Sequence, residues 1–84
     1  MHDLHLADKI HKLVLQKAKE NNLKKVTQIM IELGSVIEHG EDINKENLEF
    51  NLQMLEKGTV AEGAELNIQK VKSNSWKLIS ISGN

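Results

Sequence analysis

The first three residues, Met1-His2-Asp3, bring several metal-ligand types together at one end of the chain. They offer a free α-amino group, the imidazole of His2 and the carboxylate of Asp3. Imidazole is the commonest metal ligand among protein side chains. The same residues also fit an ordinary helix start, in which His2 is exposed and Asp3 is the N-cap. On residue types and spacing alone, the helix start is the favoured interpretation.

A cluster of donors at a chain end is useful only if a folded element holds that end still. The residues from Leu4 to Glu20 are suited to this, because apolar side chains recur there at the i, i+4, i+7 and i+8 positions of an amphipathic helix. Seven residues are predicted to face inward or to border that face: Leu6, Ala7, Ile10, Leu13, Val14, Lys17 and Ala18. Asn21-Asn22 ends the helix, since Asn is a common substitute for Gly at helix C-termini.

The next stretch, Val26 to Leu33, alternates in hydrophobicity and predicts a strand. One set of alternate residues should face the core: Thr27, Ile29, Ile31 and Leu33. Ser35 to Asp42 follows as a predicted mobile loop. A second helix is predicted from Lys45 to Lys57, with Asn44 as its N-cap and Gly58 just past its end. Its inner stripe is Leu48, Leu52 and Leu55, flanked by Phe50, Asn51 and Met54.

Two more strands are predicted, from about Ala64 to Lys72 and from Trp76 to Ser82, with Ser73-Asn74-Ser75 as the turn between them. Because they are so close in sequence, they are expected to form an antiparallel hairpin. The predicted fold class is α+β in the order α-β-α-β-β. Two helices should pack on one face of a three-stranded, mainly antiparallel sheet, and residues 1–84 should form a single domain.

Composition excludes several function classes. The net charge is −1 with interspersed charges, which argues against the basic stripe of a nucleic-acid-binding protein. No run approaches the roughly 18–20 apolar residues of a membrane span, and the N-terminus does not resemble a signal peptide. With no Cys there is no thiolate zinc site and no disulfide. These absences make a soluble cytoplasmic protein the default expectation. No catalytic triad, P-loop or suitably spaced pair of carboxylates is present, so we do not expect an enzyme.

Two stretches late in the chain carry a resemblance to a known family. Glu56-Lys57-Gly58-Thr59 and Glu62-Gly63-Ala64-Glu65-Leu66 look like the "KGT…EGAEL" segment of the HypA/HybF nickel chaperones. The opening Met1-His2-Asp3 resembles that family's Met-His-Glu, and Lys24-Lys25-Val26 through Gly34 matches its Lys-Val-rich strand. These chaperones help to mature nickel-iron hydrogenases and, in some organisms, urease. The resemblance covers residues 1 to about 72.

The family then carries a zinc ribbon with two Cys-x-x-Cys pairs, which this chain lacks. Residues 74–81 resemble the family's final strand, which follows the ribbon. We therefore expect the turn at residues 73–75 to stand where the ribbon would be, and we expect no zinc.

The resemblance implies that His2 is a nickel ligand. Ni(II) favours tetragonal nitrogen and oxygen donors. The Met1 amine, the deprotonated His2 amide and the His2 imidazole Nδ1 could form adjoining chelate rings. Asp3 is the candidate for the fourth position, through its backbone nitrogen or its carboxylate; the family has Glu there. His5 is a weaker candidate, because it is not part of the family motif.

Other histidines and acids are less favoured as ligands. His11 is interpreted as structural or merely exposed, and His39 with Glu38, Glu41 and Asp42 as part of a flexible acidic loop rather than a weak metal site. Some family members have an acid near the start of the second helix. Asn44 stands at that place here, and it is better suited to capping than to binding metal.

Two functions remain open. The first is a metallochaperone that binds Ni(II) and passes it to partners, which the resemblance identifies as a HypB-like GTPase, the hydrogenase large subunit and, in some organisms, urease maturation factors. The second is a metal-free interaction or regulatory module on the same scaffold. A monomer or a weak homodimer is expected in either case, because an exposed edge strand could pair with a second copy.

Overall fold

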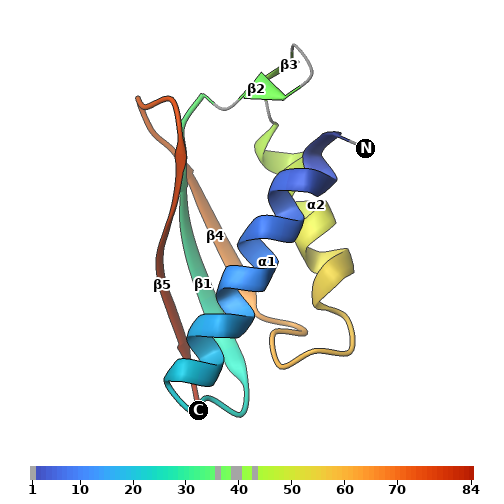
Figure 1. Cartoon of the computed structure of the whole chain (residues 1–84), viewed down its shortest axis with the longest axis vertical. Helices are drawn as coiled ribbons and strands as arrows, with labels where there is room; N and C mark the ends of the chain where they lie inside the picture. Colours follow the sequence, from blue (N-terminus) through green and yellow to red (C-terminus); the bar gives the residue numbers. More distant parts are fainter. Residues whose placement is uncertain (1, 36, 39–40, 43) are drawn as a thin grey trace.

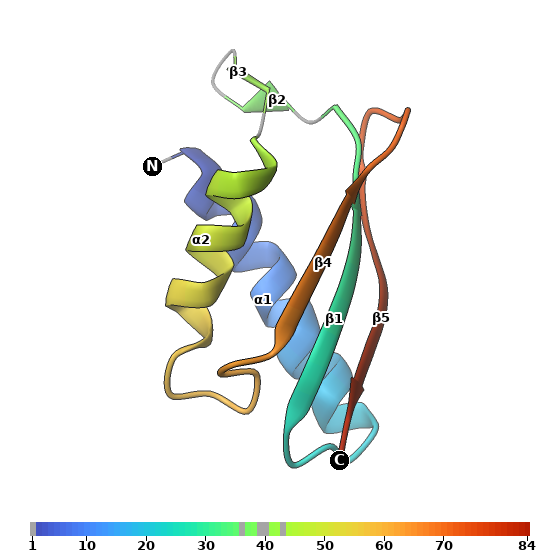
Figure 2. The ribbon, with the colours of Figure 1, turned by 180° about the vertical axis from the view of Figure 1, so that it is seen from behind.

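The computed structural model describes residues 2–35, 37–38, 41–42 and 44–84, with residues 2–5, 37–38 and 41–42 described in their backbone alone. The elements follow in this order: α1 (His2–Glu20), β1 (Val26–Leu33), β2 (Ile37–Glu38), β3 (Glu41–Asp42), α2 (Lys45–Glu56), β4 (Glu65–Lys70) and β5 (Trp76–Gly83). Both helices lie on one face of the sheet formed by β1, β4 and β5 (Figures 1 and 2). The predicted α+β fold class is confirmed.

The sheet has β1 at its centre, in the order β4-β1-β5. β4 pairs with β1 in parallel and β5 pairs with β1 antiparallel. The predicted hairpin between the last two strands is therefore wrong, because β1 lies between them. The parallel pair is possible because α2 carries the chain back across the sheet between β1 and β4, as parallel neighbours require.

The alternation predicted for β1 holds for most of the strand and fails at its start. Ile29, Ile31 and Leu33 are buried as expected, whereas Thr27 is exposed and Val26 is fully buried. The pairing with β5 is irregular between Val26 and Gln28, which reverses the faces at that point. The exposed Thr27 hydroxyl donates a hydrogen bond to the Ser82 carbonyl at 3.2 Å.

A second irregularity opposes Met30 and Ile31 of β1 to Ser80 and Leu78 of β5. It leaves Ile79 out of the register, and the Ile79 side chain is 43% exposed. Such an extra residue bends an edge strand and locally disrupts its ladder.

The first helix is longer than predicted at its N-terminal end. It begins at His2, so Asp3 lies within the first turn and is not the N-cap. Its apolar face is buried largely as predicted, although Lys17 is exposed and Leu13 is half-buried. The C-terminus closes with Asn22 at φ 56°, and Leu23 N–H donates to the Ala18 carbonyl at 2.9 Å. This bonding satisfies carbonyls that the end of a helix leaves free.

The second helix has the predicted N-cap. The Asn44 side-chain oxygen accepts hydrogen bonds from the backbone N–H groups of Glu46 (2.8 Å) and Asn47 (3.1 Å). The helix ends at Glu56, one residue earlier than predicted, and Gly58 follows with φ +78°.

The inner face of α2 differs in part from the prediction. Leu48 and Leu52 are fully buried and Leu55 is half-buried. Phe50 and Met54 are 60% and 51% exposed, so they lie on the outer side of the helix rather than beside the core.

The predicted mobile loop after β1 contains a small hairpin. Ile37 pairs with Asp42, and Glu38 pairs with Glu41, in an antiparallel two-stranded sheet. His39 lies outside the described residues.

The link between β4 and β5 crosses the end of β1. Gly34 N–H donates to the Ser75 carbonyl at 2.9 Å, and Ser35 N–H donates to the Ser73 carbonyl at 2.7 Å. A Cβ at position 34 would lie only 2.5 Å from the Ser73 carbonyl oxygen. Glycine at the end of β1 therefore makes this close crossing possible.

Candidate metal centre

The predicted nickel ligands stand at the first turn of α1. His2 and Asp3 have helical backbone, and the first four N–H groups of an α-helix have no acceptor within it. The amide nitrogens of His2 and Asp3 are thus not used by the helical hydrogen-bond ladder. Met1 and the side chains of His2, Asp3 and His5 lie outside the described part of the chain.

The helix is fixed to the body of the protein directly behind these residues. Leu6, Ala7 and Ile10 are all buried against the core, and His2 stands one turn before Leu6. This anchoring limits how far the first turn can move.

The start of α1 carries a partial positive charge, because the peptide dipoles of the helix align. This field disfavours a bare cation and favours anionic donors. Metal binding at this end is therefore favoured when deprotonated amide nitrogens or a carboxylate supply negative charge to the ion. The amide and Asp3 donors of the predicted chelate have this character.

The fold brings a second segment to the same end of the molecule. The first turn of α1 lies at the end that also holds the β2–β3 hairpin and the start of α2 (Figures 1 and 2). Glu41 and Asp42, the acids that precede Asn44 in the sequence, form β3 there. Asn44 caps α2 with its side-chain oxygen, which agrees with the expectation that it is a cap rather than a ligand.

The side chains that the structure describes form no cluster of metal ligands. No three of these His, Asp or Glu side chains lie close enough together to hold an ion. His11 is buried on α1, nine residues beyond His2, which corresponds to roughly 13 Å along the helix axis. Burial lowers the pKa of His11, and the neighbouring Asp8 carboxylate opposes this shift. His11 is thus a structural residue, one of the two outcomes expected for it.

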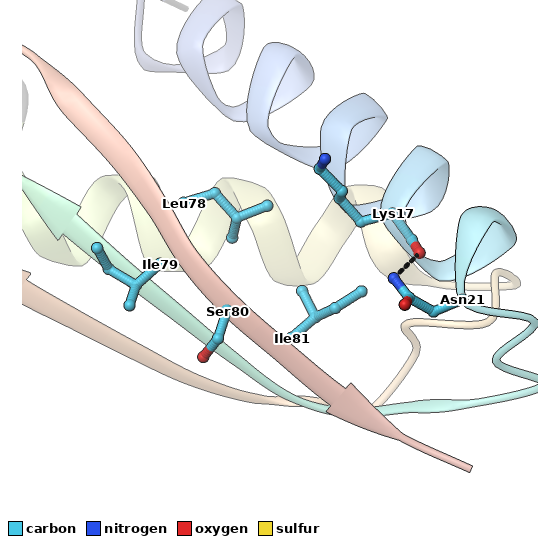
Figure 3. A pocket seen from close by; sticks show the side chains of 6 residues that line it. All are labelled: Lys17, Asn21, Leu78, Ile79, Ser80 and Ile81. Atoms are coloured by element: carbon cyan, nitrogen blue, oxygen red, sulfur yellow. Dashed lines mark hydrogen bonds between the residues drawn. The ribbon is translucent and has the colours of Figure 1, made fainter.

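A cavity of about 230 Å³ lies between the last turn of α1 and β5 (Figure 3). Leu78 and Ile81 point toward α1 across it, and the Asn21 side chain donates to the Lys17 carbonyl at 2.8 Å at its rim. The remaining lining residues are Ile79 and Ser80. The lining has no imidazole and no carboxylate, so this cavity offers no suitable metal ligands.

A second cavity, of about 270 Å³, lies at the C-terminal end of α2. One of its lining residues is Glu56, which is only 2% exposed. Burial raises the pKa of the Glu56 carboxyl to about 7. The sequence interpretation missed this residue, although its place four residues after Leu52 is a signal that could have revealed it.

Comparisons with known proteins agree with the resemblance. A family model described as "Hydrogenase/urease nickel incorporation, metallochaperone, hypA" matches residues 1–76. The hydrogenase maturation factor HypA of Methanothermobacter thermautotrophicus is 35% identical over 71 residues, which cover 84% of this chain and 55% of that protein. The factor of the same name from Thermococcus sibiricus is 36% identical over 86 aligned positions, covering 93% and 59%. The chain thus spans little more than half the length of these relatives.

A solved structure shares the fold. The solution structure of the Ni metallochaperone HypA from Helicobacter pylori superimposes with a TM-score of 0.75 and covers 96% of each chain. The two sequences are 16% identical in this superposition, so the likeness shows a common fold. The family's description is that of a metallochaperone and not of an enzyme, in agreement with the expectation from the sequence.

Proposed function

Because the chain belongs to the HypA family of hydrogenase and urease nickel-incorporation metallochaperones, we propose that it binds Ni(II) at its N-terminus and passes the ion to partner proteins. The observation that carries this proposal is the extent of the family match, which begins at residue 1 and so includes His2. Nickel is the cargo of such a protein and not a resident cofactor.

The proposed ligands are the Met1 amine, the His2 amide nitrogen, the His2 imidazole and Asp3, with His5 as a weaker auxiliary. The free amides at the start of α1 support the backbone part of this set. Four nitrogen and oxygen donors in tetragonal arrangement suit Ni(II). A site with few donors at a chain end is also open to attack by a receiving protein, as delivery requires.

Affinity alone does not select nickel at such a site. Cu(II) binds nitrogen and oxygen donors more tightly than Ni(II) does. Selectivity must therefore come from metal availability and from the receiving partners. The proposed partners are a HypB-like GTPase, the hydrogenase large subunit and, in some organisms, urease maturation factors. The proposed location is the cytoplasm. We expect no bound zinc, since the chain has no Cys.

A Ni(II) titration of protein with a native N-terminus tests the site. We expect calorimetry to show near-stoichiometric binding. The complex should have the absorption spectrum of square-planar Ni(II) and should be diamagnetic. His2→Ala and a variant with two extra residues before Met1 should both lose this binding. His11→Ala is the matched control, because it removes a histidine of the same helix outside the site.

Each variant tests a different part of the proposal. Binding that survives the N-terminal extension would exclude the terminal amine as a ligand. Binding that survives His2→Ala would exclude the site. His5→Ala tests whether His5 is an auxiliary ligand. If the variant still binds one Ni(II) per chain but with lower affinity, His5 belongs to the site.

The alternative function is a metal-free interaction module. One observation favours it: Phe50 and Met54 expose large apolar side chains one turn apart on α2. Exposed apolar groups of this kind mark interaction surfaces when they are contiguous. A chain that binds partner proteins without taking up Ni(II) in the titration would support this alternative.

A further inference from the structure

A carboxylic acid is buried where the fold calls for an apolar side chain. Glu56 follows Leu48 and Leu52 at four-residue intervals along the inner face of α2, and all three are buried. The Glu56 Oε2 atom is enclosed and has no hydrogen-bond partner among the described residues. An ionised carboxylate in such a place is costly, since burial removes its hydration without replacing it.

The acid lines a cavity of a size suited to one side-chain head group. The cavity measures about 270 Å³, below the roughly 300–1,000 Å³ of pockets that take drug-sized ligands. Its lining residues come from the end of α2 and the following loop: Gln53, Glu56, Lys57, Glu62, Gly63 and Ala64. Gly58 and Gly63 hold this loop in turns with φ of +78° and +79°, which glycine adopts without strain.

We propose that this cavity binds the ammonium or guanidinium group of a lysine or arginine side chain from a partner protein, with Glu56 as the buried counter-ion. Such a cation carries several N–H donors and needs several acceptors. Glu62 and Gln53 line the same cavity, and a carboxylate and an amide oxygen are acceptors of the required kind. The aliphatic stem of the incoming side chain can lie along the apolar wall at Ala64.

An organic cation fits this lining better than a metal ion does. The lining offers few metal ligands, namely two carboxylates and one amide. The described side chains also contain no group of three His, Asp or Glu residues able to hold a metal. Lysine and arginine head groups instead form directional hydrogen bonds with one or two carboxylates. The charges on the lining are Glu56, Glu62 and Lys57, so an ionised Glu56 leaves the cavity one negative charge in excess.

The cavity is separate from the N-terminus. The loop after α2 lies toward the opposite end of the molecule from the first turn of α1 (Figures 1 and 2). The proposal therefore stands whether or not nickel binds at His2.

The test is an NMR titration of the isotope-labelled full chain. The probes are Nα-acetyl-lysine methylamide and Nα-acetyl-arginine methylamide, with the norleucine analogue as a neutral probe of similar shape. We expect saturable shifts at the Gly63 and Ala64 amides for at least one basic probe. The Glu56 carboxyl carbon should move toward its ionised position at the same time.

Two variants and a free amine complete the experiment. Glu56→Gln keeps the shape and removes the charge, so affinity for the basic probe should fall at least tenfold. Glu46→Gln, on the exposed first turn of the same helix, should leave it within twofold. Equal binding of norleucine, or unchanged binding by Glu56→Gln, would overturn the site. Tighter binding of putrescine than of both amino-acid probes would overturn the assignment to a protein side chain.

Discussion

Glu56 combines almost complete burial with an acidic group, and this makes the stability of the protein depend on pH. Burial raises its pKa from 4.5 to about 7, because the charged form loses hydration. The unfolded chain would release this proton near pH 4.5. Between about pH 4.5 and 7 the folded state therefore holds more protons than the unfolded state. The free energy of unfolding consequently falls as pH rises through this range.

Glu56→Gln should remove this dependence. Between pH 5 and pH 8 the natural chain is expected to lose about 2 kcal/mol more unfolding free energy than the variant does. Urea denaturation of both proteins at the two pH values measures the difference. His11, whose lowered pKa destabilises the fold as pH falls below 6.5, is present in both proteins and cancels. Equal pH dependence of the two proteins would show that Glu56 is solvated or paired.

Asn44 illustrates how one element depends on a single side chain at its start. Its oxygen satisfies two of the free N–H groups of α2. Asn44→Ala should lower the unfolding free energy by about 1 kcal/mol, whereas Asn44→Asp, which retains a capping oxygen, should change it little. Thermal or urea denaturation gives both values.

The same variants separate capping from metal binding. Because the Asn44 oxygen is engaged by the backbone, Asn44→Ala should leave the Ni(II) stoichiometry unchanged. Loss of nickel binding in a folded Asn44→Ala protein would instead assign this position to the site.

At the level of helices and strands, the sequence predicted those features that depend on interactions between neighbouring residues. The apolar periodicity of α1, the cap at Asn44 and the burial of Ile29, Ile31 and Leu33 were all predictable, since each depends on a few neighbouring residues. The pairing of β4 was not, because closeness in sequence favoured a hairpin with β5. Tertiary packing instead gave the central position to β1.

The irregular positions also escaped sequence interpretation. The bulges that expose Thr27 and Ile79 depend on how two strands meet, and neither strand alone carries that information. The exposure of Phe50 and Met54 depends on which side of α2 meets α1 and the sheet. The candidate metal ligands could be predicted from the sequence only because they belong to a short family motif in the first three residues.

The whole molecule places its two proposed sites at opposite ends of one layer of helices. The 12 residues of α2 alone correspond to roughly 18 Å of helix between its cap at Asn44 and the cavity at Glu56. Both helices pack on the same buried core. Perturbations at distant sites without shared partners are usually additive.

The two proposed sites should therefore act independently. Glu56→Gln is expected to leave the Ni(II) affinity within about twofold, and His2→Ala to leave the affinity for the basic probe within about twofold. The double variant should show the sum of the two single effects in free energy. Calorimetry with Ni(II) and NMR with the lysine probe, applied to all four proteins, measure this coupling. A coupling energy above about 0.5 kcal/mol would contradict independence and show that the helical layer transmits partner docking to the metal-binding end.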